Sequence, residues 1–295
     1  MITTGQHADL GNGIRLHYAS CGERSRPLVL FLHGFPEYWG AWEELLPSFA
    51  GTHYAVAPDL RGFNLSSQPA EVAAYRAREI VGDLEHFVAH LGYDRAIVVA
   101  HDWGGAVAWQ WAIARPEHVS KLVILNSPHP VPFARELAFN PAQQRASAYM
   151  NWLRAPGAEG ALAKDDFIRL DEFFLGMQRA DAPWYTAERR ARYHAVWARG
   201  LTGGLNYYRA SPLYPPTGGD PGPKALQLNP SDFHVRVPTL VIWGEADTAL
   251  PVTLLDGLME LVDDLTVHRL PRATHWLAHE EPDEVARLIL DFISR

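Results

Sequence analysis

The chain has 295 residues, of which 47% are hydrophobic and 20% charged, a composition typical of folded proteins that excludes extensive disorder. The formal net charge of -8 argues against nucleic acid as the main partner, because nucleic-acid-binding domains usually carry a basic stripe. A single cysteine, Cys21, excludes an intramolecular disulfide and a C-x-x-C zinc pattern. The first residues lack the features of a signal peptide, and no apolar run reaches the roughly 18 to 20 residues of a membrane span. We therefore expect a cytoplasmic protein that binds no membrane.

Five short apolar runs are predicted to be buried parallel strands, because they are rich in Val, Ile and Leu and do not alternate with polar residues. Helical stretches follow or separate them, and this alternation favours an α/β fold with a mostly parallel sheet flanked by helices. The predicted strands cover residues 27–33, 53–59, 96–100, 121–127 and 238–244, and the predicted helices cover residues 75–91, 106–115 and 281–293.

The alternation stops after residue 130 and resumes near residue 230. This stretch has several helical patterns and no clear strand, and it holds 14 of the 33 aromatic residues. The aromatic side chains either form the core of a helical insertion or cover an apolar pocket, and the two interpretations are compatible. We predict a core of residues 1–130 and 231–295, with a helical insertion at residues 131–230.

The most informative motif is Ala100-His101-Asp102-Trp103-Gly104-Gly105, which lies between a predicted strand and a predicted helix. Small residues on both sides of a central polar residue are typical of a nucleophile elbow, where strand and helix backbones come close. The central residue is usually serine and is Asp102 here. A helix-capping aspartate is the structural alternative. A carboxylate nucleophile would attack an sp³ carbon and leave an alkyl ester, which water must then hydrolyse.

Two later residues fit the need for a base that activates this water. Asp247 directly follows a predicted strand, and His275 lies between a strand-like run and the last helix. The order nucleophile, acid, histidine is that of the α/β-hydrolases. His275 would activate water and Asp247 would orient its imidazole, although Glu245 is a competing acid two positions away.

The segment His33-Gly34-Phe35-Pro36 follows the first predicted parallel strand, where this fold places an oxyanion donor. We predict that the backbone N–H groups of Phe35 and Trp103 form the oxyanion hole.

With these motifs the whole chain resembles the epoxide hydrolase and haloalkane dehalogenase group of the α/β-hydrolase fold. In soluble epoxide hydrolases two tyrosines of the helical cap donate to the epoxide oxygen. One stands about seven residues before a Pro-Gly, as Tyr149 does before Pro156-Gly157, and the other lies in an Asn-aromatic-Tyr-Arg segment, as Tyr208 does. The resemblance therefore implies these roles for Tyr149 and Tyr208, although both could be core residues of the cap.

Haloalkane dehalogenases need two halide donors instead. Trp103 fits the first, but epoxide hydrolases often carry the same tryptophan. The second donor cannot be the asparagine that some of these enzymes use, because Phe35 stands at that position. A tryptophan of the cap is the other option, and the candidates are Trp152, Trp184 and Trp197. Fluoroacetate dehalogenases use arginines where this chain has Trp103 and Ala106, so that branch fits poorly.

The resemblance predicts hydrolysis of a small hydrophobic epoxide by a monomer or a homodimer, with no metal or organic cofactor. The pocket is expected to include His33, Pro36, Trp103 and Trp152. Two alternatives stay open: a haloalkane dehalogenase with the same nucleophile, and a protein that binds a hydrophobic ligand without turnover.

Overall fold

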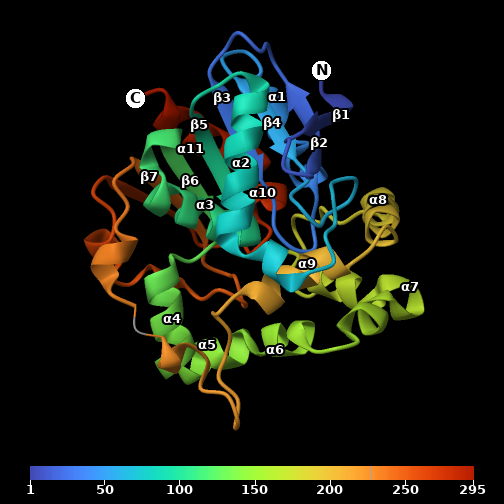
Figure 1. Cartoon of the computed structure of the whole chain (residues 1–295), viewed down its shortest axis with the longest axis vertical. Helices are drawn as coiled ribbons and strands as arrows, with labels where there is room; N and C mark the ends of the chain where they lie inside the picture. The colour runs from blue at the N-terminus through green and yellow to red at the C-terminus, as the bar shows by residue number, and fades with distance from the viewer. Residues whose placement is uncertain (227) are drawn as a thin grey trace.

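The computed structural model describes residues 1–226 and 228–295, which form an eight-stranded sheet flanked by helices (Figure 1). The strands lie in the order β1-β2-β4-β3-β5-β6-β7-β8. β2 runs antiparallel to its neighbours β1 and β4, and all other neighbours are parallel. The prediction of a mostly parallel sheet is confirmed. The strands are β1 (Thr3–Asp9), β2 (Arg15–Cys21), β3 (Leu28–Leu32), β4 (Tyr54–Pro58), β5 (Ala96–His101), β6 (Val119–Leu125), β7 (Thr239–Gly244) and β8 (Leu265–Leu270).

The central strands are continuously apolar because both faces of the sheet are covered. Side chains alternate between the two faces of a strand, so Leu30 of β3 packs into one core cluster and Phe31 into the other. The first cluster includes side chains of α2 (Ala77–Leu91) and α3 (Asp102–Ala114). The second includes side chains of α1 (Leu46–Phe49), α10 (Leu277–Glu280) and α11 (Pro282–Ile293).

The five predicted strands are present within about two residues of their expected ends, whereas β2 and the two edge strands, β1 and β8, were missed or only half recognised. β2 is buried, but His17 and Ser20 interrupt its apolar run. β1 is mostly exposed, and β8 is only partly buried. Edge strands can carry polar residues because one side faces solvent, so their sequences lack the apolar run that marks a central strand. α3 begins at Asp102, four residues before the predicted start, because the elbow residue is itself the first helical residue.

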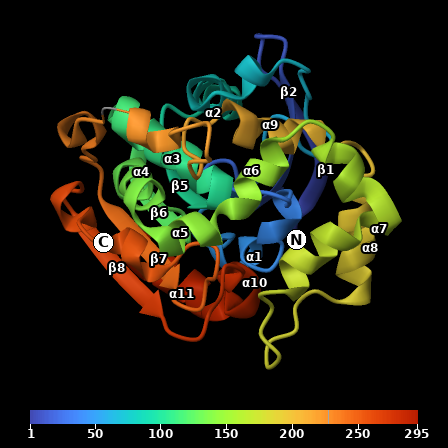
Figure 2. The ribbon, with the colours of Figure 1, turned by 90° about the horizontal axis from the view of Figure 1, so that it is seen from below.

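Among the described residues, six α-helices lie between β6 and β7, and in Figure 1 they occupy the lower part of the molecule, opposite the two termini. Viewed from below, α5 and α6 cross the centre and α7 and α8 lie to one side (Figure 2). No strand of the sheet falls among the described residues of this stretch, as the sequence predicted. The helices are α4 (Pro130–Phe139), α5 (Pro141–Ala146), α6 (Ala148–Arg154), α7 (Ala158–Leu175), which is kinked at residues 164–167, α8 (Ala187–Trp197) and α9 (Thr202–Ala210).

Each helix within residues 1–226 and 228–295 is too short or too polar to cross a membrane.

Candidate active site

Asp102 occupies a strained turn between β5 and α3. Its φ of 48° lies in the left-handed region, which non-glycine residues rarely adopt and which exposes the side chain at the end of the sheet. A Cβ at Gly104 would lie 2.4 Å from the carbonyl oxygen of Leu32, and a Cβ at Gly105 would lie 2.3 Å from the Cβ of Ser127. The two glycines are therefore required for strand and helix to approach this closely.

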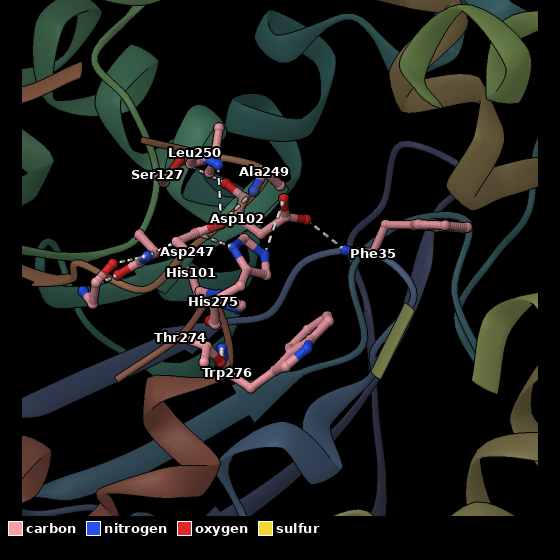
Figure 3. Close-up of polar contacts among 12 residues, drawn as sticks. Phe35, His101, Asp102, Ser127, Asp247, Ala249, Leu250, Thr274, His275 and Trp276 are labelled. Atoms are coloured by element: carbon pink, nitrogen blue, oxygen red, sulfur yellow. Dashed lines mark hydrogen bonds and ion pairs between the residues drawn. The ribbon is translucent and has the colours of Figure 1, made fainter. Parts of the chain in front are cut away.

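The Asp102 carboxylate points toward the loop after β3, where the backbone N–H of Phe35 donates to its Oδ1 atom over 2.8 Å (Figure 3). The carboxylate also packs against Gly34, where an added Cβ would lie 2.2 Å from Oδ1. Phe35 N–H is thus aimed at one of the two carboxylate oxygens. The second predicted donor, the backbone N–H of Trp103, stays a prediction.

His275 lies on the other side of the carboxylate, with Nε2 3.8 Å from Asp102 Oδ2. Its Nδ1 atom is 2.7 Å from Asp247 Oδ2, and both side chains are buried. Burial alone would lower the pKa of His275, but the charge and hydrogen bond of Asp247, together with the charge of Asp102, raise it to about 9. In the opposite direction, the imidazole lowers the pKa of Asp247 although burial would raise it.

Three donors besides His275 hold the Asp247 carboxylate. The backbone N–H groups of Ala249 and Leu250 donate to Oδ1, and the Asn126 amide donates to Oδ2 over 2.7 Å. Glu245, the competing acid, instead forms an ion pair with Arg269. Asn126 was not recognised in the sequence. The only sign of Asn126 in the sequence was its position, as a polar residue directly after a predicted central strand.

A buried carboxylate network lies behind His275 and was also missed. Glu37 Oε1 accepts from Tyr193 and lies 2.7 Å from His279 Nε2. Its other oxygen is 3.4 Å from His101 Nδ1, and His101 Nε2 lies 2.9 Å from the carbonyl oxygen of His275. Burial would raise the pKa of Glu37, but the two histidines hold it well below its usual range, so Glu37 is a buried anion.

Two cavities meet at Asp102. The large cavity has a volume of about 570 Å³ and the small cavity about 160 Å³. Asp102, Tyr149 and Tyr208 line both, whereas His275 lines only the small one. Further walls of the large cavity include Trp103, Val107, Phe133, Met150 and Leu250. Further walls of the small cavity are Phe35, Ala146, Phe173, Met177, Thr248, Ala249 and Trp276.

The tyrosines reach Asp102 from α6 and α9 of the insertion. The Tyr208 ring packs edge-on against Trp103 and Phe35, with centroid distances of 4.8 and 5.4 Å, and the ring of Tyr149 lies 6.3 Å away. Burial and the neighbouring Asp102 charge raise the pKa of Tyr149, and burial likewise raises that of Tyr208. Both hydroxyls are therefore protonated near neutral pH and can donate hydrogen bonds.

Three residues predicted for the pocket lie elsewhere, which corrects that part of the prediction. His33 is fully buried, and its Nε2 accepts from the backbone N–H of Leu60. Pro36 and Trp152 line neither cavity, and the carbonyl oxygen of Pro36 accepts from the indole of Trp197. His33 and Pro36 are close in sequence to Phe35, but this closeness does not place their side chains in either cavity.

The remaining cap tryptophans considered as halide donors are also outside the two cavities. Trp197 uses its indole N–H on Pro36, and Trp184 stacks on His279 with a centroid distance of 3.9 Å. Over residues 1–226 and 228–295, no three His, Cys, Asp or Glu side chains are grouped as metal ligands.

Comparisons with known proteins agree with this geometry. The family model of the alpha/beta hydrolase fold matches residues 27–282. Epoxide hydrolase 3 of Xenopus tropicalis is 33% identical over 98% of this chain and 78% of its own length. An AB hydrolase superfamily protein of Bacillus subtilis is 34% identical over 96% of this chain and 95% of its own.

Solved structures extend this similarity to three dimensions. The inhibitor complex of the epoxide hydrolase from Bacillus megaterium superposes with a TM-score of 0.90 at 34% identity, over 98% of this chain and 100% of that one. An epoxide hydrolase from Vigna radiata superposes with a TM-score of 0.80 at 26% identity, over 99% and 98% of the two chains. The chain thus belongs to the α/β-hydrolase family and, within it, to the epoxide hydrolases.

Proposed function

We propose that this protein hydrolyses a small hydrophobic epoxide to a vicinal diol through a covalent ester on Asp102. One observation carries the proposal: a carboxylate with one oxygen held by Phe35 N–H shares a cavity with two tyrosines, of which Tyr208 is buried and Tyr149 partly buried. An ester or amide hydrolase would not need a carboxylate at the elbow, because a serine attacks a carbonyl more readily.

In the first step, Asp102 Oδ2 attacks a ring carbon and the C–O bond of the epoxide breaks. The leaving oxygen becomes negative and takes a proton from one of the two tyrosines, Tyr149 or Tyr208, while the other donates a hydrogen bond. Tyrosine suits this role because an alkoxide leaves poorly without a proton. Ring strain supplies the electrophile, so this route needs no metal or organic cofactor.

In the second step, His275 takes a proton from water, which attacks the Asp102 carbonyl carbon. The carbonyl oxygen becomes an oxyanion at the position of Oδ1, where Phe35 N–H donates to it. Asp247 stabilises the imidazolium that forms. The ester then breaks as the departing alkoxide takes the proton from His275, and the diol leaves with an oxygen from Asp102. The proton of the Asp102 carboxylic acid formed in this step returns to the tyrosinate.

The charge of Asp102 controls when His275 can act. In the free enzyme the Asp102 carboxylate, 3.8 Å from Nε2, helps to raise the pKa of His275 to about 9. Alkylation converts that carboxylate into a neutral ester, and the loss of a nearby negative charge lowers the pKa of the histidine. With a lower pKa, the His275 imidazolium loses its proton more readily. The neutral imidazole is then available as the general base when water must be activated.

Residues 131–230 act in this proposal as a cap that supplies both tyrosines and the walls of the cavities. Their aromatic side chains exclude bulk water from the reacting atoms. A variant of the Bacillus megaterium enzyme was crystallised with its product, a naphthyloxypropanediol, at a TM-score of 0.88 with this chain. That product is a vicinal diol with a bulky apolar group, which suits a predominantly apolar cavity of about 570 Å³.

A panel of styrene-type and aliphatic epoxides, assayed beside 1-haloalkanes, tests the proposal. We expect diol from the epoxides and no halide from the haloalkanes, with Asp102→Ala inactive on both. Halide release without diol would establish the dehalogenase alternative. Saturable binding of an epoxide without any product would establish the ligand-binding alternative.

A further inference from the structure

The two cavities that meet at Asp102 differ in chemistry as well as in volume. The large cavity is lined mainly by apolar side chains, and the catalytic histidine is not among its walls. The small cavity brings the His275 imidazole, the Asp102 carboxylate and Thr248 together with both tyrosines. A buried water needs two to four polar partners, so the small cavity is the better place for the water that His275 activates.

The volume of the small cavity limits what can share it with that water. At about 160 Å³ it is close to the roughly 150 Å³ of an engineered protein cavity that holds one benzene molecule. In liquid water one molecule occupies about 30 Å³, so a phenyl ring would leave little room for the hydrolytic water. A methyl group would leave enough room for the hydrolytic water.

Building on the proposed function, we propose that the small cavity holds the hydrolytic water together with the smaller substituent of the epoxide. The large cavity takes the bulky apolar substituent. The substrates are then epoxides with one large apolar group and, on the other ring carbon, hydrogen or a group much smaller than phenyl. A phenyl group there displaces the water, so Asp102 is alkylated but the ester is hydrolysed slowly.

Met177 is one of the side chains that bound the small cavity from the insertion side. It follows α7 and lines this cavity together with Phe173, whose ring packs edge-on against Tyr149 at 5.8 Å. Met177 is partly buried, so shortening it enlarges the cavity without removing a core side chain. Met150 is the control for the large cavity, because it lines that cavity and not the small one; since it is buried, the stability of Met150→Ala is measured alongside.

The test compares three substrates: styrene oxide, trans-β-methylstyrene oxide and trans-stilbene oxide. Alkylation and ester hydrolysis are measured separately by rapid quench and mass spectrometry of the protein. In the wild type we expect the stilbene ester to be hydrolysed on the order of ten-fold or more slowly than the methylstyrene ester, after comparable alkylation. Met177→Ala should remove most of this difference, and Met150→Ala should leave it in place.

A second substitution tests the opposite direction. Met177→Phe narrows the small cavity and should slow hydrolysis of the methylstyrene ester while sparing that of the styrene ester. Equal hydrolysis of the stilbene and methylstyrene esters in the wild type overturns the inference. So does the absence of stilbene alkylation, or an equal effect of Met177→Ala and Met150→Ala. If styrene oxide gives neither diol nor ester, the proposed function itself fails.

Discussion

The sheet supplies the charged groups of the site, and the inserted helices supply neutral hydroxyls and apolar walls. Asp102, Asp247 and His275 follow strands β5, β7 and β8, and backbone N–H groups hold both carboxylates. Tyr149 and Tyr208 come from α6 and α9 and lie among aromatic rings. A buried charge requires fixed partners, because its desolvation penalty is large, whereas a buried neutral hydroxyl needs far less compensation.

This difference between the sheet and the inserted helices predicts that substitutions in the two regions have different effects on the reaction. Substitutions at the sheet should remove a chemical step, because each of these side chains provides a fixed charge at its own position in the site. Substitutions at the two tyrosines of the insertion should slow alkylation and leave ester hydrolysis intact, whereas substitutions in the walls of the small cavity should change which esters are hydrolysed. The following predictions test that division, starting with the largest effect.

Replacing the catalytic base should stop the reaction after its first step. His275→Gln should lower turnover on the order of 10⁴-fold or more, because water is no longer activated. The protein should gain the mass of one substrate on the peptide that contains Asp102. The control is His118→Gln, because this partly exposed histidine directly precedes β6, whereas the site lies at the carboxyl ends of the strands. A folded His275→Gln protein that stays unmodified would contradict the assigned order of steps.

Removing a tyrosine hydroxyl should slow alkylation and spare ester hydrolysis. Tyr149→Phe and Tyr208→Phe should each slow alkylation by roughly 10²- to 10³-fold, the usual cost of losing one donor to a developing oxyanion. Tyr185→Phe is a matched control, because its hydroxyl donates to Asp171 and it lines neither cavity. Wild-type alkylation in both variants and in the double variant would remove the main support for the epoxide reaction.

The Asn126 amide should matter through Asp247. Asn126→Gly removes a hydrogen bond to a buried carboxylate, and glycine tolerates the positive φ of 34° at this position. Hydrogen bonds to charged groups contribute about 1.5 to 3 kcal/mol, so ester hydrolysis should slow roughly 10- to 100-fold with alkylation little changed. The control is Asn140→Gly at the N-terminus of α5. Equal losses in both steps would show that Asn126 acts only on folding.

The smallest effect concerns stability. The folded pKa of His275, about 9, lies above its ordinary value of 6.5, so its charged form stabilises the fold. This contribution is fully present below about pH 6.5 and is lost as the pH rises through about 9. Urea unfolding of wild type and His275→Gln should therefore show a difference in unfolding free energy that shrinks between these pH values. A difference independent of pH would contradict the raised pKa.

The groups predictable from sequence are those whose role depends on their own neighbours in the chain. Asp102 could be predicted because its flanking small residues and preceding strand are local, and His275 and Asp247 because each also follows a strand. Asn126 and Glu37 could not, since their roles arise from contacts with Asp247 and His279, more than a hundred residues away. The central strands were predictable from apolar runs, and the partly polar edge strands were not.

The shape of the pocket could not be predicted from the sequence either, because it also depends on contacts between residues far apart in the chain. Segments from α3, α6, α7 and α9 enclose the two cavities, and their separation at Asp102 depends on how these helices pack. The predicted pocket residue His33 illustrates the limit, because a side chain two positions from Phe35 can still be fully buried away from both cavities.

A single turnover in ¹⁸O-labelled water tests the central claim, the ester on Asp102, most directly. With enzyme in excess over epoxide, the ester mechanism predicts a diol without label and one ¹⁸O atom in the peptide that contains Asp102. The oxygen that enters the diol comes from the carboxylate, and water replaces it. Label in the diol and none in Asp102 would mean that water attacks the epoxide directly, which would contradict the account.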